Sequence, residues 1–411
     1  MMSISYNKKL QKLFLLLQRI FLVVTFMVLP LSIGAAENNP DDKKLLMSAE
    51  VGFGYDDNIY RAPSGPYTDN AKHPPVPMIP VIHSSPFIPV RFLADYSSKS
   101  DATNTLVSSY KFKGSFYTNR DYSNADQQLH KINFGNIKNY SQDKKRDDEL
   151  YAGVFLGYKK RLYVDRDTGD NQQSGPNDIS DRYTYKFFGG ELNYKKEQEL
   201  MKYKLGASIE SRDYIQPGTS SYDYDNTKIG VAGDVSWKVA KPTKLYAGLE
   251  LYTLNYDTRP SRDADGTLFK SNPPRKYNYG IISVGMRHRF SRTWLIYLDL
   301  VNKQRADQFV GYDNYTKILY KARIHYRPTK KLRFKMTVSG WNRDYANALA
   351  FDEPGQAKKS YDGTLVKFSG NYQFSKTMAM NLSYLQKNQD STDLRYAYDR
   401  SITMANMEWL F

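Results

Sequence analysis

Alternation of apolar and polar residues at every second position is the feature that most limits what this chain can fold into. In one stretch the even-numbered positions include Trp294, Ile296, Leu298 and Leu300, which are apolar. The odd-numbered positions include Tyr297, Asp299, Lys303 and Arg305, which are mostly charged. Successive side chains of a β-strand point to opposite faces, so this stretch predicts a strand with one apolar and one charged face.

Stretches of this kind follow one another along the chain, separated by polar breaks. They cover residues 47–60, 87–97, 104–119, 127–141, 148–163, 182–195, 201–214, 226–238, 243–257, 276–290, 293–306, 315–327, 331–344, 362–374, 377–389 and 396–411. We therefore predict an all-β fold, a transmembrane antiparallel up-and-down β-barrel of about 16 strands, closed because open strand edges cannot be satisfied in hydrocarbon. The alternatives are a barrel of about 14 or 18 strands, or a secreted β-sandwich or propeller.

The composition agrees with a barrel and argues against a disordered chain. Mean hydropathy is −0.65, yet Tyr (35 residues) and Phe (20 residues) are abundant. A barrel needs apolar residues only at alternate positions, whereas a disordered chain of this polarity would be poor in aromatic residues. The sequence has no cysteine, which excludes disulfides, thiolate metal sites and cysteine nucleophiles.

The N-terminal residues have the three-part pattern of a secretory signal. A basic start is followed by an apolar run over 20–33 and then by Gly34-Ala35-Ala36. We predict a cleaved signal peptide over 1–36, a short periplasmic segment over 37–45, and a barrel over 46–411 in the outer membrane of a Gram-negative bacterium. A membrane-anchor helix is the alternative for the first segment, although Pro30 interrupts its apolar run.

The breaks between the predicted strands alternate in length. Short breaks lie at 195–199, 240–242, 291–292, 328–330 and 375–376, and long ones at 62–86, 164–181, 258–275 and 346–361. Outer-membrane barrels have short periplasmic turns and long outer loops, so the long breaks are predicted to be extracellular.

Cations gather on the water-facing parity of four consecutive predicted strands. They are Lys303, Arg305, Lys317, Lys321, Arg323, His325, Arg327, Arg333, Lys335, Arg343 and Lys367. Like charges side by side in a sheet repel one another, whereas a basic wall facing a water-filled lumen would attract anions. The alternative is an ordinary solvated interior, in which acids from other strands or from loops compensate these cations.

The chain ends inside the last predicted strand. Met407, Trp409 and Phe411 share one parity, and the last residue is aromatic. This ending is similar to the C-terminal signal that outer-membrane barrels present to the barrel-assembly machinery.

Few residues point to catalysis or to a cofactor. The five histidines lack metal-ligand spacing, and the Asp-rich segment 165–170 lacks the full pattern of a calcium loop. Tyr-rich segments such as 222–224 predict interfacial girdles, with sugar stacking as the alternative. We expect no enzyme activity, no cofactor, no metal and no nucleic-acid partner.

The first predicted strand carries the segment Gly54-Tyr55-Asp56-Asp57-Asn58-Ile59-Tyr60-Arg61. It resembles the opening strand of outer-membrane barrels encoded with exopolysaccharide machinery, and similar segments open lipoprotein-assembly modifiers. The resemblance implies a polysaccharide conduit and supplies no catalytic residues.

Three function classes follow. The first is a porin-like channel that passes anionic solutes or exports an acidic surface polysaccharide. The second is an adhesin or receptor that acts through the loops at 62–86 and 258–275, and an outer-membrane enzyme is the third. Expected partners are membrane lipids, lipopolysaccharide, the assembly machinery, an acidic polysaccharide and periplasmic export components. The oligomeric state stays open.

Overall fold

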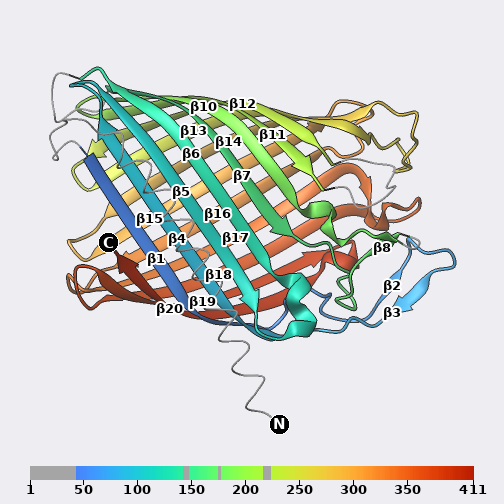
Figure 1. The fold of residues 1–411 in the computed structure, drawn as a ribbon. Helices are drawn as coiled ribbons and strands as arrows, with labels where there is room; N and C mark the ends of the chain where they lie inside the picture. The colour runs from blue at the N-terminus through green and yellow to red at the C-terminus, as the bar shows by residue number, and fades with distance from the viewer. Residues whose placement is uncertain (1–42, 142–147, 175–176, 216–223) are drawn as a thin grey trace, which may run out of the picture. The chain divides into compact units, whose positions relative to one another are not determined.

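The computed structural model describes residues 43–141, 148–174, 177–215 and 224–411. The predicted signal peptide and positions 37–42 lie outside the described residues. Within the described residues, 16 strands pair antiparallel in a closed barrel (Figure 1). They are β1 (Lys43–Asp56), β4 (Ser85–Lys99), β5 (Asn104–Tyr117), β6 (Gln127–Asn139), β7 (Asp148–Arg161), β10 (Tyr185–Glu197), β11 (Met201–Tyr214), β12 (Asn226–Ala240), β13 (Thr243–Pro260), β14 (Pro274–Arg289), β15 (Trp294–Asp307), β16 (Tyr315–Tyr326), β17 (Leu332–Leu349), β18 (Lys358–Gln373), β19 (Met378–Ser391) and β20 (Tyr398–Leu410).

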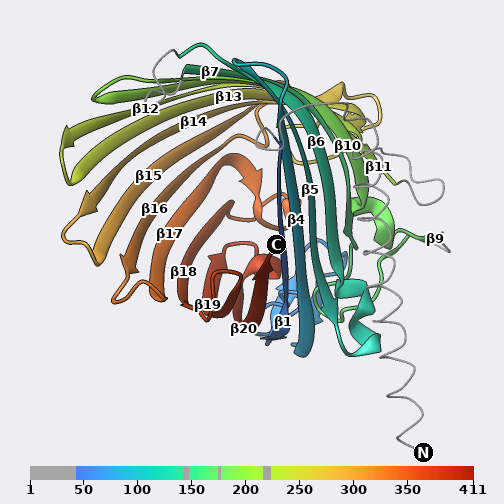
Figure 2. The same ribbon diagram turned by 60° about the vertical axis from the view of Figure 1, so that its left-hand side comes forward.

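The order of the strands confirms the predicted fold. Each strand pairs with its neighbours in the chain, and β1 pairs with β20 at the seam. Figure 2 shows β20, β1 and β4 next to one another where the barrel closes. Every predicted stretch overlaps one barrel strand. The first is shifted: β1 ends at Asp56 instead of residue 60, because the chain leaves the ladder there and turns into a loop.

Short elements that the sequence pattern did not indicate lie in the loops. Two small hairpins pair β2 (Tyr67–Asp69) with β3 (Val76–Met78) and β8 (Gln173–Ser174) with β9 (Asn177–Asp178). Single 3₁₀ turns are η2 (Arg120–Ala125), η3 (Ser180–Tyr183), η4 (Ala350–Asp352) and η5 (Leu394–Tyr396). None of the described helices is long and apolar enough to cross a membrane.

The two ends of the barrel differ, as the break lengths predicted. One end, here called the turn end, carries tight connections such as 241–242, 290–293 and 374–377. The other, here called the loop end, carries the segments 57–84, 162–184 and 261–273, with β2, β3 and β8 among them (Figure 1).

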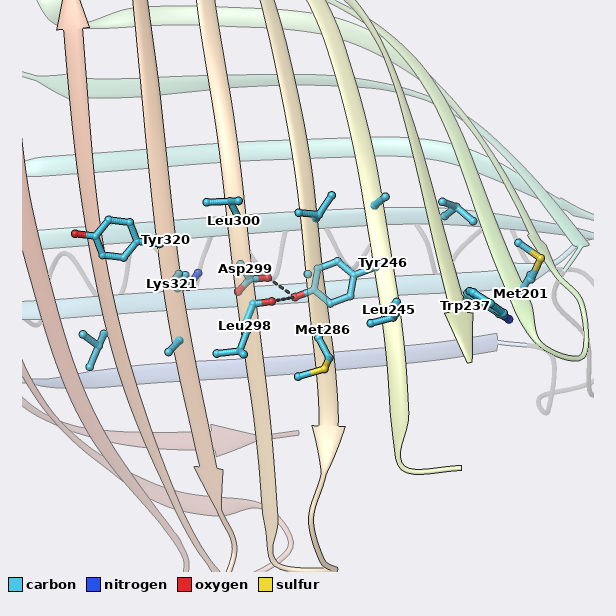
Figure 3. A pocket seen from close by; sticks show the side chains of 16 residues that line it. Met201, Trp237, Leu245, Tyr246, Met286, Leu298, Asp299, Leu300, Tyr320 and Lys321 are labelled. Atoms are coloured by element: carbon cyan, nitrogen blue, oxygen red, sulfur yellow. Dashed lines mark hydrogen bonds between the residues drawn. The ribbon is translucent and has the colours of Figure 1, made fainter. Parts of the chain in front are cut away.

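Apolar side chains cover the outer face of the sheet. A register row of directly paired positions joins Met201, Trp237, Leu245, Met286, Leu298, Ala322 and Val338 across β11 to β17. Figure 3 shows part of this row lining an apolar groove of about 790 Å³. Such side chains are solvent-exposed in the isolated chain, as Phe188 is at 64% and Phe53 at 57%. Only lipid can cover so much apolar surface on a closed barrel, so this face meets the bilayer.

Aromatic clusters lie on the same outer face, as expected for interfacial girdles. Near the turn end, Trp294 stacks on Tyr326 with ring centroids 4.3 Å apart, and Phe334 stacks on Phe368 at 5.9 Å. On β5 and β6, Phe112 packs against His130 at 4.8 Å. Amphipathic and aromatic rings suit the boundary between hydrocarbon and water.

The C-terminal residues form the seam of the barrel. Met407 and Trp409 pair with Val51 and Ala49 of β1, and therefore share the lipid-facing side. Phe411 follows the strand, and its backbone exchanges two hydrogen bonds with Met47, of 2.9 and 3.3 Å. The predicted assembly signal is thus the strand that closes the sheet; its recognition by the assembly machinery stays a prediction.

Candidate functional site

The predicted cations lie together on the face opposite the apolar one. Nine of the ten lysines and arginines belong to β15, β16, β17 and β18: Lys303, Arg305, Lys317, Lys321, Arg323, Arg333, Lys335, Arg343 and Lys367. We call these nine the basic wall. Arg327 lies beyond the end of β16, in the turn at 327–331, where its guanidinium donates to the Lys330 carbonyl at 3.3 Å.

Three wall cations stand directly opposite one another. Lys303 on β15 pairs in register with Lys317 on β16, which pairs with Arg343 on β17. Among the described residues, none of the three has a carboxylate within 4.0 Å. Like charges directly opposite in a sheet destabilise it, so this row concentrates positive charge at a cost to stability.

Aromatic rings, in place of carboxylates, support this row. Lys303 donates to the Tyr252 hydroxyl at 2.8 Å and lies 4.6 Å from the centre of the Tyr279 ring. Lys317 lies 5.6 Å from the Trp341 ring, and Arg343 lies 5.3 Å from the Tyr361 ring. The negative face of a ring attracts a cation without cancelling its charge. The row therefore keeps its net positive charge.

Two members of the basic wall are neutralised by acids. Arg323 donates to Asp299 at 2.9 Å, and the Tyr246 hydroxyl donates to the same carboxylate (Figure 3). Arg305 lies 3.4 Å from Asp313 of the 308–314 loop and donates to its carbonyl at 2.7 Å. The alternative of compensating acids thus holds for these two positions.

Four other wall residues form no ion pair among the described residues: Lys321, which stands opposite Asp299 in register, Arg333, Lys335 and Lys367. In the described part of the chain, none of them has a carboxylate within 4.0 Å. Lys335 lies directly opposite His325, whose Nε2 is buried without a hydrogen-bond partner. Positive charge therefore dominates the middle and the turn end of the wall.

Sequence reasoning missed cations elsewhere on the lumen face. Arg287 on β14 and Lys387 on β19 extend the wall on both sides, because they pair with the lumen-facing Tyr297 and Leu365. On β5 and β6, Lys111 pairs directly with Lys131. The same parity rule could have identified these residues, but they are spread over several strands and form no cluster in the sequence.

A cavity of about 420 Å³ lies at the turn end of the basic wall. Its cationic lining residues are Arg289, Arg292, Arg327, Arg333 and Lys335. The cavity places Arg327 beside the wall even though its position is in a turn. An anion that reached the barrel from the turn end would meet these guanidinium and ammonium groups first.

No metal site emerges within the described residues, where no group of three or more His, Asp or Glu side chains could hold an ion. In the Asp-rich loop segment, Asp165 accepts hydrogen bonds from the backbone N–H groups of Asp167 and Thr168, at 2.7 and 3.2 Å. This carboxylate therefore shapes its own loop.

No protein-family model matches the sequence, and no curated protein matches it. Similar solved structures include OmpT of Vibrio cholerae, with a TM-score of 0.47 and 9% identity over 92% of this chain and 100% of that one. The anion-selective porin from Comamonas acidovorans has a TM-score of 0.45 and 11% identity over 90% and 99% of the two chains. The outer membrane channel DcaP of Acinetobacter baumannii has a TM-score of 0.47 and 10% identity over 92% and 100%.

The fold assignment rests on the strand pairing of this chain and not on these distant similarities. A closed antiparallel barrel of 16 strands with an apolar outer surface fits a bilayer, because every strand edge is paired and lipid covers the apolar face. The chain is an outer-membrane β-barrel.

Proposed function

We propose that this barrel is a channel that favours anionic solutes. The observation that carries the proposal is the register row of Lys303, Lys317 and Arg343, three adjacent cations that have no carboxylate within 4.0 Å among the described residues. A row of like charges lowers stability, and its physical effect is a positive potential in the lumen, which raises the local concentration of anions.

We further propose that the solute is an acidic surface polysaccharide. In the described part of the chain, cations without an ion pair occur on two separate stretches of the lumen face, on β16 to β18 and on β5 and β6, so a polyanion could be contacted at several places at once. The opening segment at 54–61 supports this choice through its resemblance to barrels encoded with exopolysaccharide machinery.

The experiment is conductance of the purified barrel in planar bilayers, followed by block with oligosaccharides. We expect an anion-preferring current that polygalacturonate oligomers block at lower concentration than neutral dextrins of equal length. Cation preference would contradict the channel proposal. Equal block by the charged and neutral oligomers would contradict the proposal that the solute is an acidic polysaccharide, while the proposal of an anion-preferring channel would stand.

A receptor or adhesin is the second candidate, and the packing of the outer loops favours it. The Tyr67 hydroxyl in the 57–84 loop donates to Asp167 of the 162–184 loop at 2.8 Å, and the Tyr67 ring stacks on Phe351 at 6.3 Å. Three loops from distant parts of the chain therefore form one packed surface. A folded barrel that passes no current would favour this function.

A further inference from the structure

A polar cavity of about 370 Å³ lies at the loop end, away from the basic wall. Its lining comes from four segments: the 57–84 loop, η2 with the start of β6, the end of β7 with the 162–184 loop, and the region of η5 and β20. Ligand pockets in proteins start at about 300 Å³, so the cavity can take a compound of the size of one sugar ring.

The segment that opens the barrel builds one side of this cavity. Asp56 is fully buried, pairs with Arg400 of β20 and accepts a hydrogen bond from the Tyr117 hydroxyl at 2.8 Å. Asp57 accepts from the backbone N–H of Ser401 at 2.6 Å. The two carboxylates thus tie the start of the loop to the last strand.

Asn58 then turns the chain towards the cavity. Its side chain is 2% exposed, donates to the carbonyls of Ala62 and Asp399 at 3.0 and 2.8 Å, and accepts from the Ala62 N–H at 2.7 Å. Inside this turn Arg61 has a φ of 59°, in the left-handed region that few residues other than glycine adopt. A strained backbone at a charged residue points to a role for its side chain.

Arg61 meets two further arginines in the cavity, Arg161 and Arg166. Among the described residues, none of the three has a carboxylate within 4.0 Å, and Nη1 of Arg166 is buried without a hydrogen-bond partner. Burial lowers the pKa of Arg61, and the neighbouring Arg400, Arg161 and Arg166 lower it further. An anion in the cavity would relieve this repulsion and supply the missing acceptor.

Other charged groups around the cavity contact residues of the protein itself. Arg395 pairs with Asp393 at 2.9 Å, and Lys72 lies 3.6 Å from the Met78 sulfur. The acids Asp69 and Asp165 accept backbone N–H groups of their own loops, at 3.1 and 2.7 Å.

Asp167 is the acid that keeps a free oxygen. One of its oxygens accepts a hydrogen bond from the Tyr67 hydroxyl, and the other is buried and has no hydrogen-bond partner among the described residues. Burial raises the pKa of this carboxyl. Asp167 therefore favours its protonated form more than an exposed aspartate does, and in that form it can donate to a ligand oxygen.

Neutral groups in the lining suit a sugar ring. Tyr163, Tyr183 and Tyr396 present aromatic rings. The Asn124 amide is already bonded to other residues of the loops, and the Gln172 amide donates to Asp165 at 3.1 Å. Arg166 lies over the Tyr396 ring at 4.7 Å. Aromatic rings pack against the apolar face of a ring-shaped ligand.

We propose that this cavity binds a carboxylated sugar residue, with Arg61 and Arg166 on the carboxylate. The inference deepens the proposed function, because it makes a uronic-acid-type glycan the recognised solute and places its binding site at the loop end. Binding itself requires only the folded loops, so it can be measured without any current.

The test is isothermal titration of the refolded barrel with D-glucuronate, with D-glucose as the neutral ring of the same size. We expect binding of glucuronate and none of glucose. Arg166→Gln should weaken the binding of glucuronate at least about tenfold, as expected for a lost hydrogen bond to a charged group. Lys270→Gln, which removes an exposed charge from another loop, should leave binding unchanged.

Arg61→Gly separates a binding role from a structural one. Glycine accepts a positive φ without strain, so this variant should unfold at the same or a higher denaturant concentration while it loses glucuronate binding. Binding that survives in Arg61→Gly and Arg166→Gln, binding of glucose equal to that of glucuronate, or no binding of glucuronate would each overturn the proposal. Full competition by inorganic sulfate would reduce the site to an anion site and overturn its sugar specificity.

The two proposals fail separately. If the barrel binds glucuronate but shows no anion-preferring current, the proposed binding site stands and the proposed channel function is wrong. If the barrel prefers anions but does not bind glucuronate, the proposed channel function stands and the proposed binding site is wrong.

Discussion

Replacement of three lysines of the basic wall by glutamate tests whether the basic wall governs permeation. Lys321 and Lys367 lie on either side of β17, opposite Ser339 and Thr337, and Lys335 lies on β17 itself. None of the three has a carboxylate within 4.0 Å in the described part of the chain. Arg323 is left in place, because its charge is already paired with Asp299; Lys321 stands opposite the same aspartate in register without an ion pair among the described residues.

The expected effect follows from the spacing of these lysines. Neighbouring strands lie about 4.8 Å apart, so an anion in the lumen can approach all three ammonium groups to about 7 Å, where each attracts it by about 0.6 kcal/mol in water. At 0.1 M salt the Debye length is about 10 Å, and the three charges together contribute about 0.9 kcal/mol. This enriches anions near the wall about fivefold, and three glutamates would enrich cations by the same factor.

The assay is the reversal potential under a salt gradient in planar bilayers. We expect anion preference in the unmodified barrel and cation preference in the variant with Lys321→Glu, Lys335→Glu and Lys367→Glu. At 1 M salt, where the Debye length is about 3 Å, the attraction falls to about 0.2 kcal/mol and both preferences should nearly vanish. An unchanged reversal potential in the folded triple variant would refute the role of the wall.

A matched control changes the same net charge outside the lumen. Lys241, Lys330 and Lys376 lie exposed in connections at the turn end. Because bulk solvent and salt screen these positions, their replacement by glutamate should shift the reversal potential much less. An equal shift would mean that net charge, and not the wall, sets the selectivity.

Three further predictions concern topology, stability and assembly. A tag after Asp265, in the 261–273 loop, should be reachable by antibody on intact cells, whereas a tag between positions 242 and 243 should need a breached outer membrane; the opposite labelling would reverse the orientation. Asp56→Ala should lower the free energy of unfolding by about 3–5 kcal/mol in a urea titration, because it leaves the buried guanidinium of Arg400 unpaired, and a loss below about 1 kcal/mol would show that the pair is dispensable. Deletion of Phe411 should reduce the folded barrel recovered from the outer membrane more than Phe411→Ala does, because only the deletion removes both backbone hydrogen bonds with Met47; equal recovery would assign the effect to the aromatic ring alone.

Local pattern was enough to predict the strands and their two faces. The side-chain period of two is a property of each strand by itself. The lipid-facing and water-facing residues of the stretch from Trp294 onwards could therefore be predicted without knowing which strands pair with it. Break lengths likewise indicated which connections are tight. The clustering of lysine and arginine on the water-facing parity of four consecutive strands was also visible in the sequence.

Only the tertiary structure decided which charges stand together and which are cancelled. The direct pairing of Lys303, Lys317 and Arg343 depends on strand register, which one residue of slip would alter. Compensation of Arg323 by Asp299 needed the same information. The structural role of the opening segment could not be predicted from the sequence, because Asp56 pairs with Arg400, which lies 344 positions further along the chain. Alternation acts between adjacent residues and can be read along the chain, whereas register and loop packing act between residues that only the closed barrel brings together.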